Sequence, residues 1–460
     1  MRLETRAVRS ARGHVRSDTT REVGGAHVPP IDLSTTYTFD TAEAVAASMD
    51  ALIEGAGEAP NPVYARLQNP TVSRFESALA DLESAEAGVA FASGMAAITA
   101  VVMAACSEAS PEGWARGRHV VAVRPVYGGT DHLLTSGLLG TEVSWVESTE
   151  VASAVRHDTS LVLLETPANP TLVMVDIADV VSQVRACETR LGHRIAVAVD
   201  NTFATPILQR PLELGADLVV HSATKFLGGH GDVMGGVVAT SEEWAHPLRQ
   251  IRMITGGVLH PMAGYMLHRG LQTLPVRVRA QQASARVIAE RLVLHPDVIA
   301  VHYPGLSGDP VETRLLQTQQ VGPGSLLAFR VRGGREASER VMETLTLICR
   351  AVSLGSVDSL IQAPALLTHR VVDPASREAA GVPDDLLRLS VGLESVEDLW
   401  NDLEQALATV ARIVPEPKSE AEAEAEAGPG LGEGAVMSAA SPWESRAPSG
   451  EFEMVGGAGI

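Results

Sequence analysis

The chain has 460 residues, 45% of them hydrophobic, and a formal net charge of -20 at pH 7. It is long enough for two or more packed units, and its acidity argues against nucleic acid as a partner, because phosphate binding requires clustered Lys and Arg. No stretch approaches the roughly 20 consecutive apolar residues of a membrane span, and the three cysteines are far apart, so we expect a cytoplasmic protein with no membrane contact, disulfide framework or metal site.

Residues 1–60 have no clear period and are predicted to form an extended N-terminal arm. The segment that follows, "NPTVSRFESALADLE", sets apolar residues at helical spacing after an Asn-Pro-Thr start, which predicts a capped helix. Short β-branched runs then alternate with helical patterns. They lie at 119–123, 143–147, 161–165, 195–199, 217–221 and 235–239. This alternation predicts a mostly parallel sheet with helices on both faces, in a large α/β domain.

The pattern changes after Pro261, which places the boundary of the large domain near 258. One long helical stretch is predicted at 264–295, and strand candidates at 325–331 and 386–392 then alternate with helices. We therefore expect a smaller α+β domain over residues 259–414. Residues 415–460 are rich in Glu, Ala, Gly, Pro and Ser. Such a segment cannot bury enough apolar area to offset its ordering entropy, which predicts a disordered acidic tail.

Polar residues stand at the ends of the predicted strands of the large domain. In open α/β sheets, ligands collect outside the carboxyl ends of the strands. The side chains there supply an aromatic ring, an amide, a carboxylate, two hydroxyls and an amine: Tyr127, Asn169, Asp200, Ser222, Thr224 and Lys225. Each has an ordinary explanation when taken alone, as a surface lysine, a turn or a helix cap. Their convergence on one edge of a sheet favours a binding site.

The set matches the requirements of pyridoxal 5'-phosphate. The cofactor's aldehyde needs a lysine amine, its pyridine nitrogen a carboxylate, its ring an aromatic face, and its phosphate a helix N-terminus with hydroxyls. Lys225, Asp200 and Tyr127 would meet the first three needs. The phosphate would be met by the start of the helix after "GVAFA" and by the hydroxyls near the lysine: Ser93, Gly94, Met95, Ser222 and Thr224.

The order of the motifs resembles the trans-sulfuration, or Cys/Met-metabolism, family of pyridoxal-phosphate enzymes. The resemblance runs from about residue 5 to 413 and is carried by "YARLQNPTVSRFE", "ASGMAA", "VYGGT", "ETPANP", "VDNTFATP", "SATKFLGGHGDVMGG", "SLGSVDSLIQAPALLTH" and "RLSVGLE". It implies a fold-type I transferase fold, with Lys225 as the lysine bonded to the cofactor. Asp200 would be the pyridinium partner, and Tyr127 would stack on the ring and accept a proton from the substrate's amino group.

The resemblance also implies residues that spacing does not reveal. Tyr64 and Arg66 match a pair that reaches the phosphate of a neighbouring subunit, which implies a homotetramer built from dimers that share active sites. Arg388 matches the arginine that binds the substrate's α-carboxylate through two parallel hydrogen bonds, helped by Asn169 and Ser353.

The implied activity is γ-elimination from methionine or cystathionine, giving 2-oxobutyrate, ammonia and a thiol. The alternative is γ-replacement, in which a synthase joins a thiol to an activated homoserine ester with the same residues. Val352 stands where cystathionine-cleaving relatives often place Glu, which favours methionine, but Gly129 stands where methionine γ-lyases typically carry Cys. A catalytically silent binding protein is a minor third possibility, disfavoured because Lys225 and Asp200 are both present.

Overall fold

The larger of two β-sheets has seven strands in the order β1-β7-β6-β5-β4-β2-β3. The computed structural model describes residues 1–10, 27–368, 370, 377–378 and 381–410. The strands of this sheet are β1 (Ala87–Phe91), β2 (His119–Val123), β3 (Glu142–Val146), β4 (Thr159–Glu165), β5 (Ala196–Asp200), β6 (Leu218–Ser222) and β7 (Gly236–Thr240). Strands β2 to β6 pair in parallel, and β7 pairs antiparallel with both β6 and β1. The predicted mostly parallel sheet is confirmed.

Helices cover both faces of this sheet, which explains why its strands are continuous apolar runs. On one face, α4 (Gly94–Ala105), α5 (Gly128–Thr135) and α9 (Glu242–Thr255) pack against alternate strand residues. The opposite face is covered by α6 (Val151–Ala154) and α7 (Ile177–Leu191), and towards β1 and β7 by α3 (Pro70–Glu83), α8 (Thr205–Leu208) and α10 (Pro261–Leu271).

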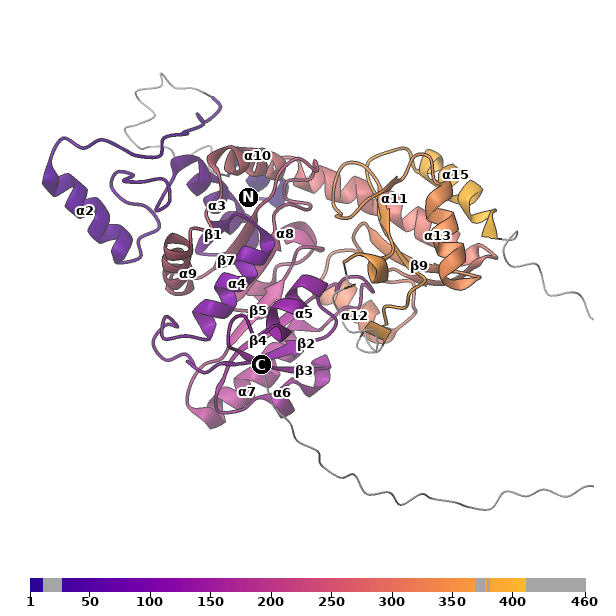
Figure 1. Cartoon of the computed structure of the whole chain (residues 1–460), viewed down its shortest axis with the longest axis horizontal. Helices are drawn as coiled ribbons and strands as arrows, with labels where there is room; N and C mark the ends of the chain where they lie inside the picture. The colour runs from indigo at the N-terminus through magenta and orange to yellow at the C-terminus, as the bar shows by residue number, and fades with distance from the viewer. Residues whose placement is uncertain (11–26, 369, 371–376, 379–380, 411–460) are drawn as a thin grey trace, which may run out of the picture. The chain divides into compact units, whose positions relative to one another are not determined.

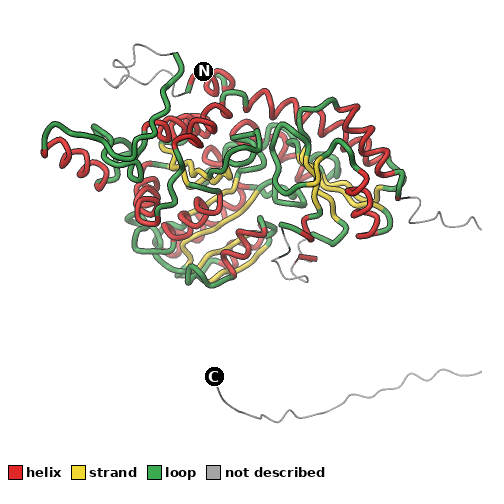
Figure 2. The backbone as a smooth tube through the Cα atoms, turned by 45° about the horizontal axis from the view of Figure 1, so that its top comes forward, coloured by secondary structure: helices red, strands yellow, loops and turns green. Residues whose placement is uncertain are grey.

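The smaller sheet has five strands in the order β10-β11-β12-β9-β8, and it is the second group of yellow strands in Figure 2. Its strands are β8 (Val298–His302), β9 (Leu326–Val331), β10 (Cys349–Arg350), β11 (Leu360–Gln362) and β12 (Leu386–Ser390). Three helices share one core with this sheet: α11 (Leu274–Leu294), α13 (Gly334–Thr344) and α15 (Val396–Leu407). Helices α13 and α15 lie side by side (Figure 1). Helix α12 (Pro310–Thr318) lies in the connection between β8 and β9.

Two segments differ from expectation. The predicted helix at 264–295 is two helices, α10 and α11, which are separated at Gln272 and Thr273. Pro275 lies in the first turn of α11, where its missing N–H removes no helical hydrogen bond, so it suits the start of a new helix.

The N-terminal segment, predicted to be extended, contains α1 (Leu3–Arg9) and α2 (Ala42–Ile53). Helix α1 packs on α3 through the buried Ala7, and the guanidinium of Arg6 donates to the carbonyl of Asp81 at 2.7 Å. This tertiary contact stabilises a helix that its own seven residues would not sustain.

The chain from Met1 to Val414 groups into one compact unit, with no division near 60 or 258. The predicted domain boundaries near 60, 258 and 414 stay predictions. The segment 415–460 lies outside the described residues. In the part of the chain that the structure describes, none of the helices combines the length and apolar character that crossing a bilayer requires.

Candidate active site

Lys225 lies in a tight turn directly after β6. Its amide donates to the carbonyl of Ser222 at 3.1 Å, and its Nζ donates to the hydroxyl of Ser353 at 2.7 Å. Burial, and then the positive charge of Arg388, lower the pKa of Lys225 from its usual 10.5 to about 8. A neutral amine is therefore far more accessible here than on an ordinary surface lysine, and the neutral amine is the nucleophilic form.

Asp200 is the last residue of β5, and its carboxylate is fixed by one neighbour. Its Oδ1 accepts from the amide of Thr202 at 3.0 Å and from the Thr202 hydroxyl at 2.5 Å. Burial raises the pKa of Asp200, while both Thr202 hydrogen bonds act in the opposite direction. A positively charged partner, such as a protonated pyridine nitrogen, would stabilise the ionised form of this buried carboxylate.

Arg388 lies in the middle of β12 and is only 2% exposed. One Nη donates to the side-chain oxygen of Asn169 at 2.7 Å and the other to the carbonyl of Ser353 at 2.8 Å. Its Nε has no hydrogen-bond partner among the described residues, and burial lowers the pKa of Arg388 to about 10. From the sequence alone, this guanidinium would be expected in water, whereas the structure buries it with fewer hydrogen-bond acceptors than it has N–H donors. A ligand carboxylate would supply the missing acceptors.

Ser353 joins the lysine to the arginine, because its hydroxyl accepts from Lys225 and its carbonyl accepts from Arg388. It adopts a φ of 93°, a left-handed conformation that is costly for a residue with a side chain. Such backbone strain is concentrated at functional sites. Val352, directly before it, is 55% exposed and so is free to contact a ligand.

The start of α4 provides a close-packed N-terminus. The hydroxyl of Ser93 caps the helix by accepting from the amide of Ala96 at 3.1 Å. The amides of Gly94 and Met95 belong to the first helical turn, which has no intrahelical acceptors for them. A Cβ on Gly94 would lie 2.8 Å from Cβ of Ser222, so only glycine fits there without a shift of its neighbour.

The two hydroxyls predicted beside the lysine differ in their surroundings. That of Thr224 donates to the carbonyl of Gly235 at 3.2 Å and accepts from the Gly235 amide at 3.0 Å, so it has intramolecular partners already. Ser222 lies against Gly94 at the start of α4, which makes its hydroxyl the better placed of the two for a phosphate.

Tyr127 is the residue directly before α5, and it is 36% exposed. Its ring lies beside Gly129 and Met95, because a Cβ on Gly129 would be 2.5 Å from Cε1 of Tyr127 and 3.2 Å from the sulfur of Met95. Gly129 thus gives the tyrosine ring the space that a side chain would take.

Tyr64 and Arg66 lie apart from this cluster in the contacts of the described residues. Tyr64 is 43% exposed, and Arg66 donates from Nη1 to the carbonyl of Met253 at 2.6 Å. The guanidinium carbon of Arg66 is 5.7 Å from the centroid of the Tyr64 ring. Two exposed side chains held together in this way suit a role towards a neighbouring subunit, and that role stays a prediction.

Sequence reasoning missed Glu165, the last residue of β4. Its two carboxylate oxygens accept from the amides of Tyr127 at 2.7 Å and Asn169 at 2.8 Å. It pairs in register with Asp200 on the neighbouring strand. The signal that could have found it is the one that singled out Asp200, an acidic residue at the end of an apolar strand.

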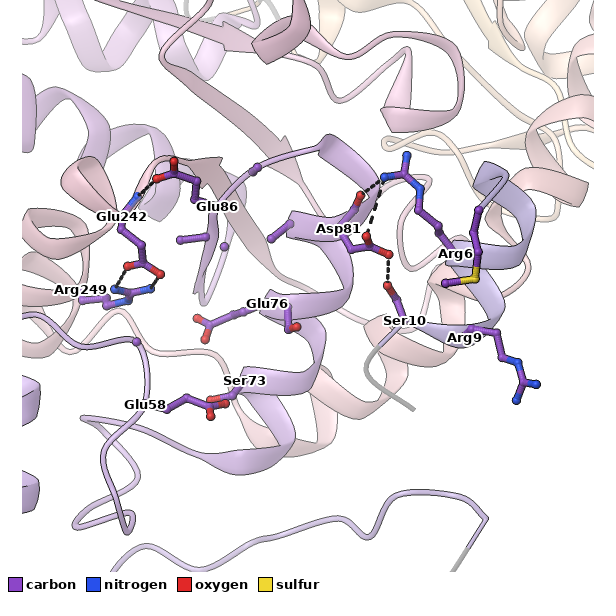
Figure 3. A pocket seen from close by; sticks show the side chains of 17 residues that line it. Arg6, Arg9, Ser10, Glu58, Ser73, Glu76, Asp81, Glu86, Glu242 and Arg249 are labelled. Carbon is purple, nitrogen blue, oxygen red and sulfur yellow. Dashed lines mark hydrogen bonds and ion pairs between the residues drawn. The ribbon is translucent and has the colours of Figure 1, made fainter. Parts of the chain in front are cut away.

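A separate groove of about 670 Å³ lies along α3, beside α1 and α9 (Figure 3). Charged residues of both signs line it, and several pair with one another, such as Arg6 with Asp81 and Arg249 with Glu242. Its described lining includes none of the residues predicted for the site and no Lys, His or Cys. We therefore assign no chemistry to this groove.

Known proteins give an independent comparison. The sequence profile of a family described as Cys/Met metabolism PLP-dependent enzyme matches residues 11–408. The chain belongs to this family. Its members depend on pyridoxal phosphate, so both the family and the cofactor predicted from the sequence are confirmed.

Similar proteins include curated enzymes and solved structures. An L-methionine gamma-lyase from Streptomyces avermitilis is 53% identical over 408 residues, which cover 88% of this chain and 89% of the relative. The solved cystathionine gamma-lyase CalE6 from Micromonospora echinospora is 37% identical with a TM-score of 0.76, covering 89% of this chain and 99% of that one. A cystathionine gamma-synthase from Xanthomonas oryzae pv. oryzae is 34% identical with a TM-score of 0.78, covering 90% and 100%. These likenesses confirm the predicted fold-type I α/β architecture.

Proposed function

We propose that this enzyme catalyses γ-elimination from L-methionine, in which methionine and water give 2-oxobutyrate, ammonia and methanethiol. The observation that carries the proposal is the meeting of Lys225 and Arg388 at Ser353. An arginine short of acceptors can hold the substrate's α-carboxylate there while a lysine of lowered pKa moves protons on the adjacent carbons.

The residues fit the cofactor of the family. Lys225 would bond to its aldehyde, Asp200 would pair with its pyridine nitrogen, and Tyr127 would face its ring. Its phosphate would meet the N-terminus of α4, where the space beside Ser222 admits only a glycine. When bound, pyridoxal phosphate supplies an electron sink for the negative charge that develops on Cα.

Each residue of the site would then have a separate role in binding or proton transfer. Arg388, aided by Asn169, binds and orients the α-carboxylate, and Ser353 holds the arginine and the lysine in fixed relation. Tyr127, as its phenolate, would accept a proton from the incoming amino group. The amine of Lys225 takes the Cα proton and moves protons at Cβ, so that the sulfur can leave from Cγ.

Methionine is preferred over cystathionine because of Val352. This exposed apolar side chain adjoins Ser353 and offers no charge to the distal ammonium group of cystathionine. The similar curated enzymes named as L-methionine gamma-lyases support the same choice. The alternative is γ-replacement, since a solved relative is a cystathionine gamma-synthase and the residues required are shared.

A product assay separates these possibilities. The purified holoenzyme is incubated with methionine, with cystathionine, or with an O-acylhomoserine plus cysteine, and the products are identified by mass spectrometry. We expect 2-oxobutyrate and methanethiol from methionine at the highest rate. A new thioether formed faster than any 2-oxobutyrate would establish the synthase instead, and turnover of none of the three would favour a silent binding protein.

We also propose a homotetramer built from dimers that share active sites, and a cytoplasmic location. The exposed pair of Tyr64 and Arg66 supports the shared site. All three cysteines, Cys106, Cys187 and Cys349, are free thiols, as is usual in a reducing compartment.

A further inference from the structure

Glu165 is a nearly buried acid, 5% exposed, whose partners are backbone amides from two different loops. Oε2 accepts from the amide of Tyr127, in the loop after β2, at 2.7 Å. Oε1 accepts from the amide of Asn169, in the loop after β4, at 2.8 Å. One carboxyl group therefore holds both loops at the carboxyl edge of the large sheet.

Each of these two loops contributes a different part of the proposed reaction centre. From Asn169 a line of hydrogen bonds continues to Arg388, to Ser353 and to the amine of Lys225, with distances of 2.7, 2.8 and 2.7 Å. From Tyr127 the same carboxylate fixes the backbone that carries the ring beside Gly129. Glu165 is the single acid in this line of contacts.

The contacts of Glu165 explain why a carboxyl group is needed there. Burial, and then the negative charge of Asp200, its register partner on β5, raise the pKa of Glu165 well above its usual range. The hydrogen bonds from the amides of Tyr127 and Asn169, and last the charge of the nearly buried Arg388, act in the opposite direction. An amide side chain of the same shape would present an NH₂ group to one of the two amide donors and leave that donor without an acceptor.

We propose that Glu165 is a positioning residue, whose carboxylate sets the Tyr127 ring and the Asn169–Arg388 pair in fixed relation so that a substrate's amino and carboxylate groups are received together. The proposal rests on the function proposed above, in that it takes an amino acid as the ligand. It concerns the binding of that amino acid and not the fate of its sulfur.

The test uses L-norleucine, in which a methylene replaces the sulfur of methionine, so that it has no leaving group. Its Kd for the holoenzyme is measured by calorimetry, and the visible circular dichroism of the bound cofactor reports the surroundings of its ring. In Glu165→Gln we expect the Kd to rise about tenfold, through the loss of one of the two amide hydrogen bonds, and the dichroism to change. In Glu165→Asp, which keeps the carboxyl group but cannot reach both amides, we expect a change in the same direction, and this variant serves if the Gln variant does not fold.

Asp402→Asn is the matched control. Asp402 is also a nearly buried carboxylate, on α15, and it accepts hydrogen bonds from the backbone amides of Thr346, Leu347 and Ile348, just before β10. Its replacement should lower the Tm without altering norleucine binding or the dichroism. The proposal is overturned if both Glu165 variants lose Tm as this control does and bind norleucine as the wild type does.

The outcome is separable from that of the proposed function. A wild-type enzyme that binds norleucine but makes no 2-oxobutyrate from methionine would contradict the function and leave the role of Glu165 intact. Turnover of methionine together with unchanged norleucine binding in both Glu165 variants would contradict the role of Glu165 alone.

Discussion

Lys225 shows how burial and a neighbouring positive charge prepare a residue for chemistry. Its amine has a serine hydroxyl as partner, and burial, followed by the charge of Arg388, lowers its pKa to about 8. No described carboxylate forms an ion pair with it, which would have stabilised the charged form and raised the pKa.

The lowered pKa predicts how cofactor uptake depends on pH. Because the folded protein disfavours the ammonium form, the neutral amine becomes the main form as pH rises through about 8 and not through 10.5. The rate at which apoprotein takes up pyridoxal phosphate, followed by its visible absorbance, should therefore rise through about pH 8 and then level off. A rate that keeps rising towards pH 10 would contradict this, and Lys225→Ala should give no such band at any pH.

Among the elements, the ends of α3, β5 and β6 are tied together by one buried acid. Oε1 of Glu83, at the end of α3, lies 2.6 Å from Nε2 of His221 and 3.0 Å from Nδ2 of Asn201, and all three side chains are inaccessible to solvent. His221 and Asn201 adjoin the residues that begin the lysine turn and end the strand of Asp200. The proposed catalytic residues Lys225 and Asp200 therefore lie next to strand ends that share one hydrogen-bonded acid.

The close contact at the start of α4 predicts that replacing Gly94 weakens cofactor binding. In Gly94→Ala the new Cβ would lie 2.8 Å from Cβ of Ser222, so the helix N-terminus or the serine must shift, and such overpacking costs about 1–3 kcal/mol. We expect the Kd for pyridoxal phosphate, measured by equilibrium dialysis, to rise about tenfold or more, in proportion to that cost.

Gly257→Ala is the control for this variant. A Cβ there would meet its nearest neighbours, Thr255 and Ala96, at 3.7 and 3.8 Å, which is ordinary contact. Cofactor affinity should stay close to that of the wild type. Equal affinities in the two variants would show that the N-terminus of α4 does not hold the phosphate.

At the scale of the whole molecule, the site needs both sheets. The large sheet supplies Lys225, Asp200, Tyr127 and Asn169, and the smaller sheet with its connections supplies Arg388 and Ser353. If Tyr64 and Arg66 serve a neighbouring subunit, a complete site draws on two chains as well.

Subunit mixing tests that arrangement. Lys225→Ala and Arg66→Ala should each be nearly inactive, but hybrids of the two should regain part of the activity, because one site of each hybrid dimer then has an intact lysine and an intact partner arginine. The control is a mixture of Lys225→Ala with Arg388→Ala. Lys225 and Arg388 meet at Ser353 of the same chain, so no hybrid restores a site. Equal activity in both mixtures would contradict sharing.

The sequence by itself determined the alternation of strands and helices and indicated the cofactor, because hydrophobic period and the polar residues at strand ends are local features of the chain. The resemblance of its ordered motifs to a known family identified the family. It did not predict the helices of the first 60 residues or the break between α10 and α11, which depend on packing partners and on a single turn. Only the tertiary structure decided that Arg388 is buried against Asn169, 219 positions away, and that Ser353 joins it to Lys225. Local patterns cannot encode such contacts, since burial and hydrogen bonding between distant segments arise only when the two sheets pack together.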